Sequence, residues 1–420
     1  MKVLHVSTYD HYSGAAIAAN RLHLALESID VSTQMLVQEK RTKLPSVIGP
    51  KGNFESFINL FVRPKIGSLI GKLQKSTNPI KHSYNFLPSG KHRLINRLDP
   101  DIVHLHWINN EMITIKEISK IDIPIVWSFH DMWPFCGAEH VDDLTYPERY
   151  TKSYNKQNRP KPYTGIDLDK WTWKRKKKYW DKNDFNIVVP SKWMKNCVKK
   201  SMLFNQSDVT VIPNPINTDI FKPIGKTTAR YLLNLPNDKK IICFGAIGAS
   251  KNSIKGFNYL KSALRILKDE RFDKKIILLI FGDTHEREEE LMGYNVKYYG
   301  RVKEEVKLAL IYSSVDLVVV PSEIESFGQV AAESLSTGTP VVSFDIAGLK
   351  DVINHRSNGY LAQPFDSIDL AEGIKWILNL NSEDYTRICK MGREKVMSSF
   401  DKTLTAEKYK SLYKSILETS

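Results

Sequence analysis

The sequence predicts an α/β protein with two doubly wound domains in series and a cleft between them. In both halves of the 420-residue chain, short apolar runs rich in β-branched residues alternate with segments of helical apolar spacing. This alternation is typical of a parallel sheet covered by helices on both faces. Between the halves, "VIPNPINTDIFKPIG" (211–225) holds three prolines and two asparagines, which indicates a turn-rich connection.

The first half opens with a predicted strand, "KVLHVS" (2–7), and a predicted helix, "IAANRLHLALES" (17–28), whose apolar residues follow helical spacing. Four further runs predict strands: "STQMLV" (32–37), "DIVHLHW" (101–107), "IPIVWSFHD" (123–131) and "FNIVVPS" (185–191). In such sheets, ligands bind outside the carboxyl ends of the strands.

The second half repeats this plan around one clear helix, "FNYLKSALRILKDE" (257–270), in which apolar residues recur every three or four positions. Its predicted strands are "KIICFGA" (240–246), "KIILLIFGD" (275–283), "VKYYG" (296–300), "VDLVVVPS" (315–322) and "PVVSFD" (340–345).

Composition excludes several protein classes. Hydrophobic residues make up 42% of the chain, which is too many for a disordered protein. The longest apolar runs, such as "IILLIF" (276–281), are too short to span a bilayer. The opening "MKVLHVST" lacks the order of a signal peptide, and the four cysteines have no paired spacing. We therefore expect a cytosolic protein without disulfides or a zinc knuckle.

Two glutamates eight positions apart stand out in "SEIESFGQVAAESLSTGTPVV" (322–342). Glu325 precedes a helix predicted from about Gly328 to Ser336, and Glu333 lies inside that helix. The free N–H groups at the start of a helix bind anions, and Gly328 lets a phosphate approach the backbone. Carboxylates accept hydrogen bonds from hydroxyls, so a nucleotide sugar fits this pattern. The alternative is that neither glutamate binds a ligand: one is an acid at the helix N-terminus that complements the helix dipole, and the other is a solvated surface residue.

This stretch also carries a resemblance to a known family. "PSEIESFGQVAAESLSTGTPVVSFD" (321–345) is similar to the Glu-x7-Glu signature of retaining family 4 glycosyltransferases, which have two Rossmann-like domains (the GT-B fold). Segments 189–201, 211–223 and 357–374 resemble other parts of the same family in the expected order. "SGAAIAANRLHLAL" (13–26) and "VHLHW…SFHDMWPF" resemble its subgroup associated with capsule, exopolysaccharide and O-antigen assembly.

The resemblance implies a domain plan and a reaction. We expect residues 1–212 to form an acceptor-binding domain and 213–395 a nucleotide-sugar-binding domain, with 396–420 forming a helix that packs back on the first. The implied reaction moves a hexose from a UDP-, GDP- or ADP-type sugar to a hydroxyl of a glycan acceptor that is lipid-linked, with retention at the anomeric carbon. No cofactor is expected.

The resemblance also implies roles for individual residues. Glu325 would contact the donor hexose and Glu333 the ribose, while Lys255 would neutralise the diphosphate leaving group. Ala246 stands where the family usually has a second phosphate-binding arginine, and Lys251 is the expected substitute. The other residues that we expect at the donor are Gly14, Arg301, Ser326, Phe327, Gly328 and Gln329. Taken alone, the lysines fit solvated surface positions and Gly14 fits an ordinary turn.

His130 follows the buried run "IPIVWSF", at the carboxyl edge of a predicted strand. The resemblance implies that it faces the donor sugar as a neutral hydrogen-bond donor, poised by the adjacent Asp131. A core or capping histidine is the alternative. His104 and His106 project from one face of their strand, but no acidic or cysteine ligand accompanies them at a recognised spacing. We therefore predict no metal and a metal-independent reaction.

A basic excess lies in the first half. Residues 1–200 hold 32 Lys and Arg against 19 Asp and Glu, and thus nearly all of the net charge of +14. "KWTWKRKKKYW" (170–180) mixes cations with aromatics, and 53–75 places phenylalanines at helical spacing beside basic residues. We predict contact with the anionic inner face of the cytoplasmic membrane. One alternative is a solvated helix whose tryptophans point into the core. The other is nucleic-acid binding, because mixed aromatic and basic residues can also stack on bases, but no nucleic-acid-binding fold motif supports it.

Two other functions remain open from the sequence. One is a nucleotide-sugar epimerase or glycan phosphorylase on the same two-domain plan. The absence of a recognisable pyridoxal-binding lysine motif and the family resemblance along the chain argue against it. The other is a non-catalytic protein that binds sugar or nucleic acid, and the missing arginine favours it. Release of nucleoside diphosphate from a donor would discriminate between these functions.

Overall fold

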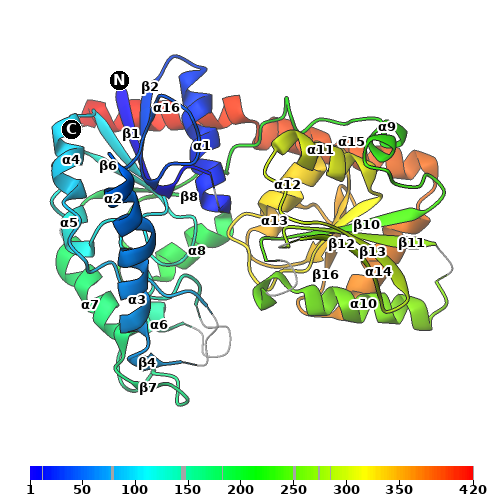
Figure 1. Cartoon of the computed structure of the whole chain (residues 1–420), viewed down its shortest axis with the longest axis horizontal. Helices are drawn as coiled ribbons and strands as arrows, with labels where there is room; N and C mark the ends of the chain where they lie inside the picture. Colours follow the sequence, from blue (N-terminus) through cyan, green and yellow to red (C-terminus); the bar gives the residue numbers. More distant parts are fainter. Residues whose placement is uncertain are drawn as a thin grey trace. The chain divides into compact units, whose positions relative to one another are not determined.

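The computed structural model describes residues 1–11, 13–76, 80–142, 148–181, 183–248, 252–272, 275–283 and 285–419. The chain forms two compact units, one of Met1–Ile212 with Ala406–Ser420 and the other of Pro213–Thr405 (Figure 1). Each unit is built on a seven-stranded, largely parallel sheet with helices packed on it, so each is a Rossmann-like domain. The predicted fold class is confirmed.

All strand pairs in the sheet of the first unit are parallel, and its strand order is β3-β2-β1-β5-β6-β8-β9. Its strands read as continuous apolar runs because both faces are covered. Their bounds are Lys2–Tyr9 (β1), Ser32–Glu39 (β2), Val47–Ile48 (β3), Ile102–Leu105 (β5), Ile125–Ser128 (β6), Phe185–Val189 (β8) and Val209–Val211 (β9). A separate antiparallel pair joins Gln74–Lys75 (β4) to Thr164–Gly165 (β7).

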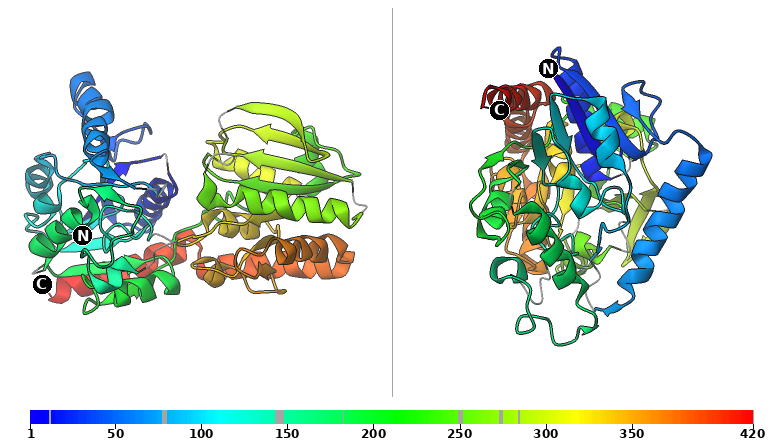
Figure 2. Two further views of the ribbon diagram at one scale, coloured as in Figure 1. Left: turned by 90° about the horizontal axis from the view of Figure 1, so that it is seen from below. Right: turned by 90° about the vertical axis from the view of Figure 1, so that its left-hand side faces the viewer.

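The helices of the first unit follow these strands. They are Gly14–Glu27 (α1), Asn53–Phe57 (α2), the π-helical turn Ile58–Val62 (η1), Arg63–Gly71 (α3), Lys91–Leu98 (α4), Ile115–Ile118 (α5), Arg149–Lys152 (α6), Leu168–Trp180 (α7) and Lys192–Lys200 (α8). The segment α2–η1–α3 runs along one side of the unit (Figure 2). It carries the exposed apolar side chains of Phe54, Phe57, Phe61, Ile66 and Leu69.

The last helix, Lys402–Thr419 (α16), packs on the sheet of the first unit. Tyr409 and Tyr413 are buried there among Val3, Leu22 and Val126. The residues from 396 to 399 belong instead to the preceding helix, Ser382–Ser399 (α15), so the expected start of the final helix at 396 is wrong. A turn at Phe400 separates the two helices.

The sheet of the second unit has the order β12-β13-β11-β10-β14-β15-β16. Its strands are Lys240–Gly245 (β10), Ile276–Phe281 (β11), Glu286–Leu291 (β12), Tyr294–Tyr299 (β13), Leu317–Val320 (β14), Val341–Phe344 (β15) and Gly359–Ala362 (β16). All pairs are parallel except β12 with β13, which form an edge hairpin.

Helices cover both faces of this second sheet, and a separate apolar cluster fills each face. They are Lys226–Leu232 (α9), the 3-10 turn Ser253–Lys255 (η2), Phe257–Asp269 (α10), Glu305–Ser314 (α11), Gln329–Ser336 (α12), Leu349–Val352 (α13) and Ser367–Asn379 (α14), together with α15. Because β10, β11, β13 and β14 are parallel, the loops that follow them lie at the same edge of the sheet, where ligands bind in such folds. Among the described residues, no helix is long and apolar enough to cross a membrane.

Candidate functional site: the loop before helix α12

The loop between β14 and α12 contains the predicted glutamate motif. Gly328 is the N-cap of α12 and has φ of +99°, a conformation that favours glycine. A Cβ at this position would lie 2.6 Å from Leu349 Cδ2, so the loop and α13 are packed against each other. The predicted helix from Gly328 to Ser336 is confirmed, and its first N–H groups have no intrahelical acceptor.

Lys255 and Glu325 meet at this loop. The Lys255 ammonium Nζ lies 2.5 Å from Glu325 Oε1, and the Ser322 hydroxyl donates to the same oxygen at 3.0 Å. The lysine side chain is 29% exposed and the glutamate side chain 19% exposed. The pair is therefore partly shielded but reachable by a ligand from solvent.

Two close backbone contacts hold these loops together. The Glu323 N–H donates to the Ile254 carbonyl at 2.8 Å. Gly256 has φ of +72°, and a Cβ there would lie 1.7 Å from the Pro321 carbonyl oxygen. Only glycine permits this approach, so the Lys-Gly pair in the sequence places Lys255 against the glutamate loop.

Glu333 is buried inside α12, with 4% of its surface exposed. The Tyr312 hydroxyl donates to its Oε2 at 3.0 Å, and the Gln329 amide donates to its Oε1 at 3.2 Å. A carboxylate has room for further donors, since its two oxygens offer about four lone-pair positions. A hydrogen bond to each of its two oxygens therefore fixes the orientation of the Glu333 carboxylate.

The other predicted donor residues lie nearby in the chain but differ in burial. The Phe327 side chain is buried against Phe400, whereas Ser326 and Gln329 are partly exposed. Arg301 is exposed and follows Gly300, whose carbonyl accepts from the N–H of Gly282 at the end of β11. Lys251 lies outside the described residues.

Gly14 and His130 belong to the first unit. Gly14 is the first residue of α1, next to the N-cap Ser13, and it is exposed. Its φ is not positive, so its backbone conformation does not require glycine.

His130 follows β6 and contacts His106, not Asp131. The His130 Nε2 lies 3.1 Å from His106 Nδ1. Burial lowers the pKa of His130 to about 4, although the negative charge of Asp131 acts to raise it. The ring is therefore neutral near pH 7. The expectation that Asp131 poises His130 stays a prediction: the charge of Asp131 raises the pKa of His130, while the Asp131 carboxylate itself is turned toward other donors.

Those donors include His140, which sequence analysis missed. His140 Nδ1 lies 2.6 Å from Asp131 Oδ2, and the Trp107 indole N–H donates to the same oxygen at 2.9 Å. Burial opposes ionisation of Asp131, but His140 and these hydrogen bonds hold its pKa below the usual value. His140 follows Asp131 by nine residues, and nothing in that spacing marked the pair.

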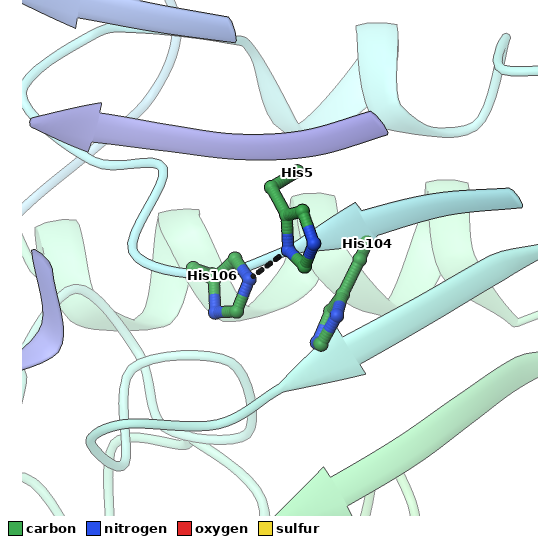
Figure 3. Close-up of side chains that lie close together, drawn as sticks. All are labelled: His5, His104 and His106. Carbon is green, nitrogen blue, oxygen red and sulfur yellow. Dashed lines mark hydrogen bonds between the residues drawn. The ribbon is translucent and has the colours of Figure 1, made fainter. Parts of the chain in front are cut away.

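His130 is the outer member of a larger histidine network. His5, on strand β1, lies with its Nδ1 2.9 Å from His106 Nε2 (Figure 3). The ring of His104 is tilted against both, with its centre 5.1 Å from that of His5 and 4.1 Å from that of His106. His104 contacts the Tyr413 hydroxyl at 2.6 Å and the Ser128 hydroxyl at 2.8 Å. Burial and mutual repulsion lower the pKa of His5, His104 and His106 well below 6.5, so the network is neutral.

The basic run at 170–180 forms most of helix α7, and two of its five consecutive cations serve the fold. Lys176 is buried, with its ammonium bonded to the carbonyls of Trp133, Cys136 and Gly137. Arg175 donates to the carbonyls of Tyr84 and Asn85. Trp173 and Trp180 are buried, as the alternative of a solvated helix with its tryptophans in the core expects, whereas Trp171 is 38% exposed. Membrane contact through this run stays a prediction.

Comparisons with known proteins agree with this architecture. The model of Glycosyltransferase Family 4 matches residues 48–220, and that of Glycosyl transferases group 1 matches residues 226–395. An uncharacterised glycosyltransferase of Methanocaldococcus jannaschii is 32% identical over 203 residues, which are 46% of this chain and 50% of that protein. A D-inositol 3-phosphate glycosyltransferase of Xylanimonas cellulosilytica is 32% identical over 180 residues, 39% of this chain and 41% of that protein. The chain thus spans half or less of the length of these curated relatives.

Solved structures share the fold over the whole chain. Sucrose-phosphate synthase from Thermosynechococcus elongatus has a TM-score of 0.70 at 17% identity and covers 100% of both chains. HepE from Anabaena, solved with UDP and glucose, has a TM-score of 0.64 at 15% identity, covering 99% of this chain and 100% of that one. WaaG, a glycosyltransferase involved in lipopolysaccharide biosynthesis, also has a TM-score of 0.64, at 12% identity over 98% and 99% of the two chains. The two family models together span most of the chain in the order expected for the GT-B fold, and the chain belongs to the group 1 glycosyltransferases.

Proposed function

We propose that the protein is a retaining hexosyltransferase that moves a sugar from a nucleoside-diphosphate donor to a hydroxyl of a glycan acceptor. The observation that carries this proposal is the Lys255–Glu325 pair in the loop before α12. It combines an ammonium for a diphosphate with a carboxylate for sugar hydroxyls, at the edge of the sheet where such folds bind nucleotides.

Two named relatives support the nature of the donor and of the product. HepE has been crystallised with UDP, with UDP and glucose and with UDP-glucose, which favours a nucleotide sugar here. WaaG acts in lipopolysaccharide biosynthesis, which favours a lipid-linked acceptor in surface polysaccharide assembly, such as capsule or O-antigen.

In the proposed reaction, the donor diphosphate lies at the amino end of α12, with backbone N–H groups of 326–329 directed toward it. Glu325 accepts hydrogen bonds from hexose hydroxyls, and Glu333 accepts from the ribose. Lys255 stabilises the charge that grows on the diphosphate as the anomeric C–O bond breaks. With Lys255 and the helix in this role, the step requires no divalent ion. His130, neutral near pH 7, contributes a hydrogen bond to the donor sugar.

Retention is proposed to follow a front-face route. The acceptor oxygen bonds to the anomeric carbon on the face that the diphosphate leaves, and the departing phosphate oxygen takes the acceptor's proton. A double displacement instead needs a carboxylate beside the anomeric carbon. Glu325 is held by Lys255 and Ser322, which suits a hydroxyl-binding role better than that of a nucleophile.

We also propose that the first unit docks on the inner face of the cytoplasmic membrane through the segment α2–η1–α3. Phe54, Phe57 and Phe61 are 78%, 55% and 62% exposed there. Lys51, Lys65 and Lys72 are exposed in or beside the same segment. Exposed aromatics next to cations fit an anionic lipid surface, where each cation contributes about 1 kcal/mol.

Release of nucleoside diphosphate by the purified protein tests the proposed activity. UDP-, GDP- and ADP-sugars are each incubated with wild type and with Glu325→Gln, and the freed nucleotide is measured with and without EDTA. We expect one class of donor to be hydrolysed or transferred, with the rate at least 100-fold lower in Glu325→Gln and unchanged by EDTA. The matched control, Glu323→Gln, removes a neighbouring carboxylate that contacts Tyr259 instead. A protein that releases no nucleotide from any donor, or that loses equal activity in both variants, contradicts the proposal.

A further inference from the structure

A second cluster of ionisable side chains lies in the first unit, among segments far apart in the sequence. His82, Glu139 and Asp169 each direct one ligand atom at a common point, and these atoms all lie within 4.8 Å of one another. His82 and Glu139 face each other across an isolated antiparallel bridge, and Asp169 lies in the first turn of α7. Glu139 and Asp169 are 5% and 3% exposed.

The three inward atoms have no hydrogen-bond partner among the described residues. They are His82 Nε2, Glu139 Oε2 and Asp169 Oδ1. A buried carboxylate oxygen without a donor is costly, and two of them facing one imidazole nitrogen are more so. Such a group of orphaned atoms needs an occupant.

The outward atoms of the same side chains are all held. His82 Nδ1 lies 2.7 Å from the Ile80 carbonyl, which makes Nδ1 the donor and leaves Nε2 as a bare lone pair in the neutral ring. Gln74 donates to Asp169 Oδ2 at 2.7 Å, and the Tyr154 hydroxyl donates to Glu139 Oε1. This is how neighbouring groups orient metal ligands, by hydrogen bonds to the atoms that do not bind the metal.

The spacing suits a metal ion better than a proton. His82 Nε2 and Asp169 Oδ1 are 3.5 Å apart, which is long for a hydrogen bond. Two ligands at about 2.1 Å from a tetrahedral zinc ion lie about 3.4 Å from each other. A protonated His82 would donate a hydrogen bond to Asp169 only, and Glu139 Oε2 would still lack a partner. A single metal ion would be coordinated by all three atoms.

Nearby protein cations do not replace this occupant. Arg149 lies 2.8 Å from Asp167 and 3.7 Å from Asp169 Oδ2, on the outward side of that carboxylate. The Lys176 ammonium is bonded to three backbone carbonyls, and burial lowers its pKa to about 7. Arg149 and Lys176 therefore act on these carboxylates through space, and no ammonium or guanidinium among the described residues is bonded to the inward oxygens.

We propose that His82, Glu139 and Asp169 bind one divalent transition-metal ion, with zinc the best match. One imidazole and two carboxylates suit zinc, and its charge of +2 balances the two carboxylates. His82, together with Gln74 and Lys81, also lines a cavity of about 450 Å³, so the cluster lies beside a space that solvent can enter. The ion joins the start of α7 to the loop after β6, which also carries His130. This departs from the expectation that the chain binds no metal.

The histidine trio of Figure 3 is a poorer site, although its atoms also lie within 4.8 Å of one another. Both nitrogens of His104 and both of His106 already have hydrogen-bond partners. A metal there would break at least two of these bonds, and it would have no carboxylate to offset its charge. His5 therefore provides the control.

The test uses the full chain after treatment with a chelator and dialysis. Zinc is added, excess is removed, and metal content is measured by mass spectrometry. We expect one zinc per chain after the excess is removed. In a separate scan with free zinc kept at about 100 times Kd, we expect a rise in Tm of about 5 °C. Glu139→Gln and His82→Ala should lose the bound zinc and the rise in Tm, while His5→Gln keeps both.

His82 lies at the cavity wall and is partly exposed, so His82→Ala keeps the test valid should a change at buried Glu139 prevent folding. Absence of stoichiometric zinc from the wild-type chain would overturn the proposal. So would zinc that stays bound in His82→Ala, or zinc that is lost only in His5→Gln.

Discussion

The Lys255 ammonium lies 2.5 Å from Glu325 Oε1, although the two residues are 70 positions apart in the chain. The contact joins the turn after β10 to the loop after β14, two neighbouring strands of the sheet. It fixes the positions of the ammonium and of the glutamate carboxylate relative to each other. Preorganised charges of this kind contribute most to stabilising a leaving group.

The close approach of Gly256 to Pro321 predicts a large effect of a single methyl group. Gly256→Ala adds both a strained φ and an overlap with a backbone oxygen 1.7 Å away. Gly90→Ala is the matched control, because Gly90 has φ of +70° and open space around it. We expect Gly90→Ala to lower the free energy of unfolding by about 1 kcal/mol and Gly256→Ala by clearly more. Urea denaturation measures both, and equal losses would show that the two loops do not pack this closely.

Glu333 is predicted to serve the donor as well as the fold. Glu333→Gln should weaken donor binding by about tenfold, since a hydrogen bond to a charged group contributes about 1.5 kcal/mol or more. Tyr312→Phe removes only the hydroxyl that donates to Glu333 Oε2, so it should lower stability by about 1 kcal/mol with little change in affinity. Calorimetric titration with the donor compares the two variants. Equal losses of affinity would make Glu333 a structural residue.

The buried histidines predict a loss of stability on acidification. The pKa of His130 falls from 6.5 to about 4 on folding, so between these values the unfolded chain binds a proton that the folded chain does not. The free energy of unfolding therefore decreases as pH falls through this window, by up to about 1.4 kcal/mol per pH unit for each such histidine. Burial lowers the pKa of His104 in the same way.

Urea denaturation at pH 7, 6 and 5 measures this dependence in wild type and in His104→Gln. The other buried ionisable groups are common to both proteins, so the difference between their slopes reports on His104. We expect a shallower pH dependence in the variant. Identical slopes would mean that His104 is protonated in the folded chain.

Membrane docking predicts that three phenylalanines control vesicle binding. Replacing Phe54, Phe57 and Phe61 by serine should weaken binding to vesicles containing anionic lipid by at least tenfold, because each ring contributes about 1.5 kcal/mol or more when buried. Tyr231→Ser, at a side chain that is 79% exposed in the second unit, is the control. Co-sedimentation at low and high salt reports both contributions, since salt screens the lysines and not the rings. Failure of the wild-type protein to co-sediment with anionic vesicles would contradict the proposal that this segment docks on the membrane.

The strands and helices that bury an apolar face were predictable from sequence, because that burial imposes a period on their apolar residues. The run 315–322 and the helix 257–270 form β14 and α10 as expected. The edge strand β12 was missed because "EREEEL" has none of the apolar character of a buried strand. It is stabilised by cross-strand pairs, with Arg287 stacked 3.6 Å from the ring centre of Tyr298.

The candidate site was predictable in part for a similar reason. Glu325, Lys255 and Gly328 stand in short motifs whose backbone requirements are local. His140 and the cluster of His82, Glu139 and Asp169 are formed by segments separated by up to 87 positions, and no spacing rule connects them. The burial of Lys176 depends likewise on carbonyls of 133–137, which only the folded chain brings together.

The most direct test of the account is whether Lys255 binds the donor diphosphate. Titration of wild type with the donor that it hydrolyses, or with the matching nucleoside diphosphate, gives the affinity by calorimetry. We predict that Lys255→Met weakens this affinity at least tenfold, while Lys390→Met, at a lysine that is 75% exposed on α15, leaves it within twofold. An affinity in Lys255→Met equal to that of wild type would contradict the claim that this loop binds the nucleotide sugar.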